Sequence, residues 1–356
     1  DDTTLIRWAN LVKAETLAVF NQRVTKMATQ LKVTRGRKLR TDGTVVETNI
    51  HAPSDSHLLE DSVRVIGRTL QRAKRVISKQ TGLADKVFRN RIRSARKTGR
   101  QIRRLITRQK EAGKQAYRKL VKITKQTVDQ AKQVLETLAE LSDDPAQGLR
   151  DTLETFIPRA EQVIDQTIRR VFRDEKVPAE DKIVSIFEPH TAIIRRGKAG
   201  KPVEYGRKVW LDEVEGGIVT RWEVLDGNPN DKLQWVPSLD AHQQLFGKPP
   251  TQASADRGVF SADNETEAKN RGIKRVVLPK PGKKSEKRCQ HEKQPWFRRA
   301  RTWHAGVEGR ISVLKRCYNL DRCLNQSQDG FHRWVGWGVI THNLNKIGST
   351  VVARSG

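Results

Sequence analysis

The stretch RTDGTVVETNI, residues 40–50, places an isolated acid, Asp42, directly before a run of β-branched residues. β-Branched side chains favour an extended backbone, so we predict a strand over Thr44–Ile50 with Asp42 at its entrance. Taken alone, an Asp-Gly pair beside a strand is more often an ordinary turn than a functional site. The segments on either side of this stretch decide between the two interpretations.

Helical segments are predicted on both sides of this strand. Before it, apolar residues recur at helical spacing from Leu5 to Met27, which predicts one amphipathic helix or a helix pair within an N-terminal helical segment, residues 1–38. After it, from about Asp55 to Asp174, Gly and Pro are scarce and apolar residues stand three or four positions apart. We therefore predict an all-helical insertion, residues 57–180, inside a core domain formed by residues 39–56 and 181–348.

After Pro178 the apolar residues begin to alternate, which is typical of strands. Removing the helical block leaves an ordinary mixed α/β domain, so the predicted fold class is α/β, a mixed sheet flanked by helices with a long insertion after its first strand. The expected strands are Ile183–Phe187, Lys208–Leu211, Gly217–Val224, a short strand reaching Asp256, and Ile273–Leu278. The expected helices are Asp231–Phe246, Asn264–Arg271, Trp296–Arg316 and Phe331–Ile347, with a mobile basic loop over Pro279–Pro295.

The charge of the chain points to a polyanionic partner. Among 356 residues there are 69 Lys and Arg against 41 Asp and Glu, a formal net charge of +28. Such a charge attracts polyanions through counterion release, so nucleic acid is the leading partner and an anionic membrane surface the second. No run approaches the ~18 to 20 apolar residues that a membrane-spanning helix needs.

One part of the helical insertion is especially basic. Between Arg89 and Arg108 the charged residues are all positive, whereas a merely solvated helix face usually carries both signs. We favour DNA contact over plain solvation for this run. The residues expected to touch DNA here are Arg96, Arg100, Arg103 and Arg104.

Several other classes of function have little support. The three cysteines, Cys289, Cys317 and Cys323, do not form the paired spacing of a structural zinc site, and they are expected to be reduced thiols. No GxxxxGK[ST] element supports ATP binding. The chain opens with Asp1 and polar residues and not with a signal peptide, so we expect a cytoplasmic protein whose upstream residues are missing.

Three isolated acids stand in settings that suit metal-dependent phosphodiester chemistry. Two-metal catalysis needs carboxylates from separate elements that converge on ions roughly 3.5 to 4 Å apart. Asp42 lies at a strand start, Asp256 at a strand end and Glu308 on a helix. Considered alone, each of these acids is better explained as part of an ordinary turn or as a helix residue that faces water.

Taken in order along the chain, these motifs resemble bacterial insertion-sequence DDE transposases of the ISNCY type. The resemblance runs from about Asp2 to Gly348 and is carried by an ordered set of motifs, which is far more specific than any single one. The motifs are Arg40–His51 followed by Ser54–Ser56, Phe187–Thr191 with Arg196–Lys198 and Tyr205–Lys208, Ala255–Gly258 with Ser261, and Gly306–Arg310 with Leu314–Arg316.

The resemblance implies a ribonuclease H-like catalytic core, Mg²⁺ or Mn²⁺ as cofactor, and transposition of an insertion sequence by DNA cleavage and strand transfer. It assigns Asp42, Asp256 and Glu308 as catalytic residues and metal ligands, and Lys315 as a DNA-binding residue near the element end. Arg310 and Arg316 are expected at DNA as well. The places that hold a Tyr and an Arg in related groups hold Arg301 and His304 here, and the resemblance assigns neither residue a role.

Two other functions share the same sequence features. A catalytically inactive DNA-binding relative would have the basic surface, although all three acids are retained here. A metal-dependent nuclease without joining activity would use the same ligands. For the transposase we expect element ends and target DNA as partners, a homodimer or higher assembly on DNA, no membrane association, and a bacterial, nucleoid-associated location.

Overall fold

The computed structural model describes residues 2–81, 89–141, 144–198 and 201–355. The chain divides into two compact units. The sheet unit comprises Asp1–Asn49 and Ala192–Gly356, and the helical unit comprises Ile50–Thr191. The helical unit therefore interrupts the sequence of the sheet unit once, directly after its first strand.

The sheet unit is built on a mixed seven-stranded sheet. The strand β1 (Lys38–Thr48) lies at its centre, antiparallel to β3 (Lys201–Val214) and parallel to β5 (Gln252–Ser254). The main strand order is β2-β3-β1-β5-β6, and β4 pairs with β3 while β7 pairs with β1. The remaining strands are β2 (Ala192–Lys198), β4 (Ile218–Val224), β6 (Arg275–Val277) and β7 (Arg322–Cys323).

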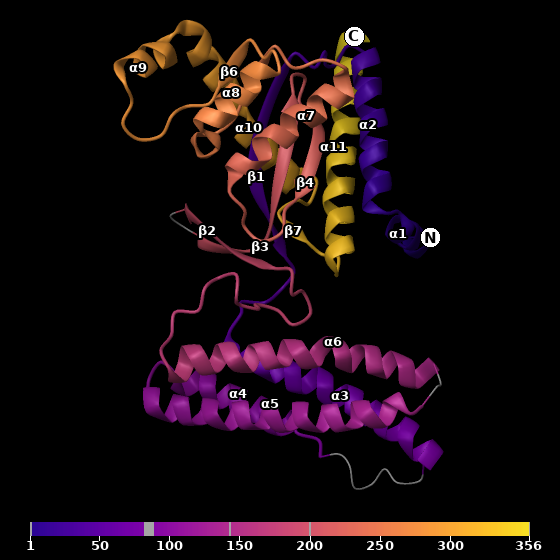
Figure 1. Cartoon of the computed structure of the whole chain (residues 1–356). Coiled ribbons are helices and arrows are strands. Elements are labelled where there is room, and N and C mark those ends of the chain that lie inside the picture. Colours follow the sequence, from indigo (N-terminus) through magenta and orange to yellow (C-terminus); the bar gives the residue numbers. More distant parts are fainter. Residues whose placement is uncertain (1, 82–88, 142–143, 199–200, 356) are drawn as a thin grey trace. The chain divides into compact units, whose positions relative to one another are not determined.

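Helices cover both faces of this sheet. One hydrophobic cluster joins Leu39 of β1 to Leu239 of α7 (Trp235–Phe246) and to Ala268 of α8 (Ala262–Asn270). The other joins Val46 of β1 to Leu314 of α10 (Pro295–Cys317) and to α11 (Gln328–Ser355). The N-terminal helices are α1 (Asp2–Leu11) and α2 (Ala14–Gln30), and α2 lies beside α11 (Figure 1).

Strand β1 is longer than expected at its start. The sequence predicts a strand from Thr44 with Asp42 at its entrance, but β1 already begins at Lys38, so Asp42 lies inside it. The extension is possible because the charged Arg40 has a partner, Glu213 of β3, at 2.7 Å. A buried strand tolerates a cation when an opposite charge and hydrogen bonds compensate for the water that it gives up.

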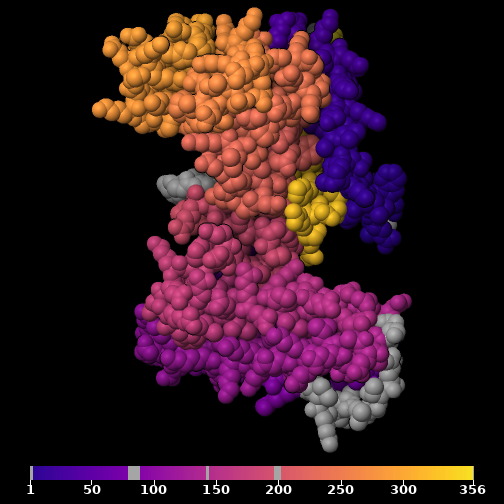
Figure 2. Space-filling model, viewed as in Figure 1, coloured from indigo at the N-terminus to yellow at the C-terminus, as the bar shows by residue number. Residues whose placement is uncertain are grey.

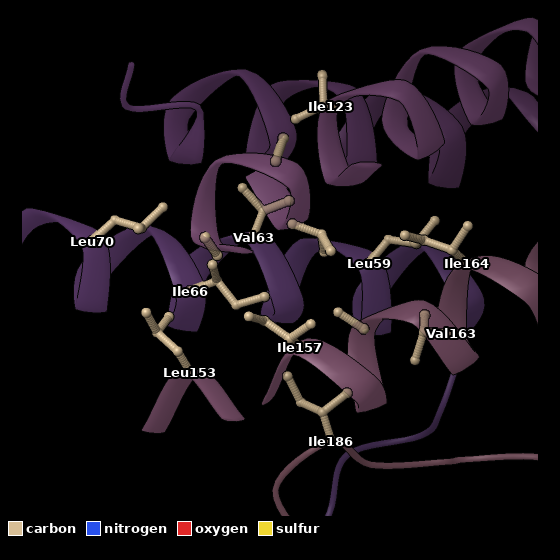
Figure 3. Close-up of a cluster of buried hydrophobic side chains, with 14 of the residues drawn as sticks. Leu59, Val63, Ile66, Leu70, Ile123, Leu153, Ile157, Val163, Ile164 and Ile186 are labelled. Atoms are coloured by element: carbon tan, nitrogen blue, oxygen red, sulfur yellow. The ribbon is translucent and has the colours of Figure 1, made fainter. Parts of the chain in front are cut away.

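The helical unit confirms the predicted helical block. Its helices are α3 (Asp55–Thr81), α4 (Ile92–Leu105), α5 (Lys110–Ala139) and α6 (Asp144–Thr167), followed by a short π-helix over Ile168–Phe172. Figure 3 shows aliphatic side chains from these helices meeting in one core. Members of that core include Leu59, Ile66, Leu70, Ile123, Leu153 and Ile164.

The strand expected at Ile183–Phe187 is absent, and that prediction was wrong. Ile186 is buried in the core of the helical unit (Figure 3). The backbone N–H of Ile183 donates to Gln166 Oε1 at 3.0 Å, so the segment is held by a helix and not by a sheet. A short apolar run does not by itself distinguish a strand from a segment that packs on helices.

The segment Pro279–Pro295 is also more ordered than expected. It contains the helix α9 (Glu286–Lys293), and Arg288 donates to Glu265 of α8 at 2.9 Å and to Glu292 at 2.8 Å. Around α9 the orange segment forms part of a continuous surface of the sheet unit (Figure 2). Interleaved acids therefore anchor a stretch whose Lys and Pro content suggested a mobile loop. None of the helices in the described ranges combines the length and the apolar character that crossing a membrane requires.

Candidate active site

One edge of β1 is interrupted at the level of Asp42. Strand β3 occupies the opposite edge of β1 from Leu39 to Glu47. On the interrupted edge, β5 pairs only with Lys38–Arg40 and β7 only with Glu47–Thr48. Residues 41–46 therefore have no strand partner on that edge within the described residues, and the sheet opens there.

Asp42 and Asp256 both follow the last paired residues of β1 and β5 at this opening. Arg40 of β1 is in register with Ser254 of β5. Strand β5 ends at Ser254, and Asp256 follows it by two residues just as Asp42 follows Arg40 by two residues, so both acids come directly after the last paired residues of the two parallel strands. Asp42 is half-buried, whereas the Asp256 side chain is 72% exposed.

The side chain of Asp42 belongs to the face of the sheet that α10 and α11 cover. Side chains alternate along a strand, so Asp42 shares a face with Arg40 and with Val46. Val46 packs with Leu314 of α10 and Val335 of α11. Asp42 is therefore directed to the side of the sheet that carries Glu308.

Two contacts fix how α10 runs along β1. Near the start of the helix, Arg40 donates a hydrogen bond to the carbonyl of Trp303. Near its end, Lys315 Nζ donates to the carbonyl of Val45 at 2.7 Å. Helix and strand thus run in the same direction.

Glu308 and Asp42 both lie in the stretch between these two contacts. Glu308 follows Trp303 by five residues, a rise of ~7.5 Å along a helix. Asp42 follows Arg40 by two residues, ~6.6 Å along a strand. Asp42 therefore lies between the two β1 residues, Arg40 and Val45, that contact α10, and Glu308 lies between the two α10 residues, Trp303 and Lys315, that contact β1.

Glu308 also lies on the helix face that is turned toward the sheet opening. At 100° per residue, His304, Glu308 and Lys315 fall within ~40° of one another around α10. His304 Nε2 is 4.0 Å from Asp256 Oδ1, and Lys315 reaches β1. Glu308 stands between these two contacts and is exposed.

The donor set fits a hard divalent cation, which prefers carboxylate oxygens and water. The Glu308 side chain has no hydrogen bond or ion pair with any residue that the structure describes, and within the same residues the one ion-pair contact of the Asp256 side chain is His304. Neither carboxylate is neutralised by a lysine or an arginine. Across the described ranges, no three His, Cys, Asp or Glu side chains are arranged to hold a metal ion, so the acids are neighbours that do not enclose a common point.

A buried ionic cluster beside the acids was missed by sequence reasoning. Glu213 of β3, whose side chain is 1% exposed, accepts hydrogen bonds from Arg40 Nε at 2.9 Å and Nη2 at 2.7 Å. Arg310 Nε of α10 also reaches Glu213 Oε1, at 3.2 Å, and its Nη1 contacts His342 Nε2 at 3.0 Å. The carboxylate thereby joins β1, β3 and α10.

Two features could have revealed this cluster from the sequence. Arg40 stands where an apolar residue is expected in a buried strand, and Asp212-Glu213 interrupts the apolar run of β3. Gly306 also has a role, because a Cβ there would lie 2.5 Å from Arg40 Nη1. A side chain at this position would push the guanidinium away from α10.

The residues expected at DNA differ in their surroundings. In the sheet unit, the guanidinium of Arg310 is engaged by Glu213, and the Lys315 ammonium by Val45, while Arg316 is exposed. In the helical unit, Arg103 pairs with Glu60 at 3.2 Å. The exposed residues Arg96, Arg100 and Arg104 have no acidic partner within the described residues. A shallow surface pocket on α4 is lined by Lys97, Arg100, Gln101, Arg104 and Leu105.

Comparisons with known proteins add no relative. The chain matches no protein-family model, no curated protein and no solved structure. Its function is therefore inferred from its own residues and their arrangement.

Proposed function

We propose that this protein is a DDE-type DNA transposase, with a ribonuclease H-like core, that cleaves DNA at insertion-sequence ends and transfers the freed strand to target DNA. The main support is that Asp42 and Asp256 each follow the last residue pair of the neighbouring parallel strands β1 and β5, while Glu308 lies on α10 between the two contacts that join this helix to β1. The mixed sheet with helices on both faces is compatible with a ribonuclease H-like fold. The ordered motifs resemble those of such transposases.

Asp42, Asp256 and Glu308 would hold Mg²⁺ or Mn²⁺. When bound, such ions activate water and stabilise the leaving 3′ oxygen of a phosphodiester. The exposure of Asp256 and Glu308 suits this role, since DNA has to reach the site. Three carboxylates that are brought together without a cation repel one another. This repulsion agrees with the finding that, among the described residues, the three acids do not form a group that could hold a metal ion.

Other residues of the chain would hold the DNA and the helix that carries Glu308. Arg316 is exposed on α10, two turns beyond Glu308, where a guanidinium can contact a phosphate. Lys315 and Arg310 are tied to β1 and β3, so their contacts in this structure hold α10 against the sheet. In the helical unit, Arg96, Arg100 and Arg104 would bind the phosphate backbone without reading its sequence.

A strand-transfer assay tests this proposal. Genomic DNA that flanks the gene supplies candidate element ends, which are offered pre-cleaved to the full chain with a target plasmid and Mg²⁺. Joined product is expected. Nicking without joining would indicate a nuclease, and DNA binding without either reaction would indicate a catalytically inactive relative.

The matched variants are Asp256→Asn and Asp263→Asn. Asp263 is an exposed acid in the first turn of α8, seven residues further along the chain. The same chemical change there leaves the proposed site intact, so joining should persist. Equal loss of joining in both variants would mean that the assay responds to charge alone.

A further inference from the structure

His304 is a buried residue directed at the proposed site. It lies on α10 one turn before Glu308, and its side chain is 10% exposed. Its Nε2 faces Asp256 Oδ1 at 4.0 Å, which is beyond hydrogen-bond length. Its Nδ1 is buried and has no hydrogen-bond partner among the residues that the structure describes.

Two other buried histidines each have at least one hydrogen-bonded ring nitrogen. His242 Nε2 is 3.0 Å from the carbonyl of Gly36, although its Nδ1 has no partner among the described residues. His342 lies 3.0 Å from Arg310 through Nε2 and 3.2 Å from Asn343 through Nδ1. A buried polar group left without a partner costs ~1 to 3 kcal/mol. His304 differs because neither of its ring nitrogens has a hydrogen bond within the described residues, while its Nε2 is turned to a carboxylate.

We infer that His304 Nε2 is a nitrogen ligand of the divalent ion that Asp256 would bind. The inference rests on the proposed function, because it concerns the same site. Two donor atoms bound to one ion at about 2.1 Å each can be separated by up to about 4.2 Å. The observed 4.0 Å between Nε2 and Oδ1 lies within that limit, and exposed Asp256 can adjust toward the ion.

The ligand set then becomes Asp42, Asp256, Glu308 and His304. An imidazole favours transition metals, whereas Mg²⁺ prefers oxygen ligands and water. The site should accordingly bind Mn²⁺ and Co²⁺ more tightly than a set of three carboxylates would. Replacing His304 should reduce affinity for these ions more than affinity for Mg²⁺.

Electron paramagnetic resonance of Mn²⁺ bound to the full chain tests the ligand directly. Pulsed spectra of the wild-type protein should show coupling to ¹⁴N, and growth with ¹⁵N-labelled histidine should change it to ¹⁵N coupling. This experiment needs no variant, so folding defects cannot obscure it. Mn²⁺ that binds through Asp256 without any histidine nitrogen coupling would overturn the inference and leave the proposed function standing.

Variants connect the signal to His304. His304→Gln should abolish the coupling and weaken Mn²⁺ binding by about tenfold or more, the scale at which even outer-shell partners act. His51→Gln is the matched control, because His51 is an exposed histidine with Nε2 3.7 Å from Asp61. Equal loss in both variants would contradict the inference. If Asp256→Asn leaves Mn²⁺ binding unchanged, both the inference and the proposed metal site fail.

Discussion

Replacing Glu213 by Gln should destabilise the sheet unit strongly. The substitution keeps the shape of the side chain but removes the one carboxylate that two guanidiniums share. Arg40 and Arg310 have side chains that are only 10% and 19% exposed, so water cannot replace the missing partner fully. Removing one partner of a buried ionic group costs about 3 to 5 kcal/mol. Because Gln retains one hydrogen-bond acceptor, we expect a loss near the lower end, about 3 kcal/mol.

Denaturant unfolding followed by tryptophan fluorescence measures this loss. All eight tryptophans of the chain lie in the sheet unit, so their emission reports on that unit alone. The matched control is Glu223→Gln on β4, where Glu223 is 46% exposed and pairs with Arg221 at 3.0 Å. An exposed pair contributes at most about 1 kcal/mol. If Glu213→Gln costs no more than this control, the buried cluster does not hold α10 to the sheet.

Three further outcomes are expected. Gly309→Ala should stabilise α10 by up to about 1 kcal/mol, because no atom lies within 4 Å of the added methyl group. Gly306→Ala should instead destabilise the protein by displacing Arg40, and the unfolding temperatures of the two variants measure the difference. Burial lowers the pKa of His242 to about 4 from its ordinary value of 6.5. The neutral histidine therefore contributes its full stability above pH 6.5, and this stability is lost as the pH falls toward 4, at up to ~1.4 kcal/mol per pH unit. In urea unfolding at pH 7 and 4.5, the stability of His242→Gln should change less with pH than that of the wild type. Charge reversal at Arg96, Arg100 and Arg104 should weaken binding to any DNA sequence and reduce the salt slope by roughly one for each phosphate that the protein no longer neutralises, while an unchanged slope would identify a merely solvated helix face.

Local patterns predicted most of the elements. The α/β organisation and the helical block followed from the spacing of apolar residues, and the turn between β3 and β4 contains Gly216 and Gly217, whose positive φ angles of 87° and 77° suit glycine. The three acids were named from their settings, but the register that aligns Asp42 with Asp256 depends on how distant strands pair. No local pattern encodes that pairing.

The errors have a common physical origin. Ile183–Phe187 was assigned to a strand because its apolar residues were interpreted as alternating, whereas its packing against the helices of its own unit determines its conformation. The sequence prediction started strand β1 too late because the charged Arg40 stands before the β-branched run, although Glu213, far away in sequence, neutralises it. The helix α9 was missed because its stability comes from ion pairs such as Arg288 with Glu265. In each case a long-range partner overrides the local preference.

Mg²⁺-dependent cleavage of element-end DNA by single and combined acid variants tests the central claim most directly. If Asp42, Asp256 and Glu308 act as one unit, each single change to Asn or Gln should reduce cleavage by about three orders of magnitude or more. The triple variant should be hardly worse than any single one, because residues that act together are not additive. DNA binding and the fluorescence unfolding transition should persist in every variant. Full Mg²⁺-dependent cleavage by Asp256→Asn, or losses that simply add, would contradict the assignment of these three acids to one active site.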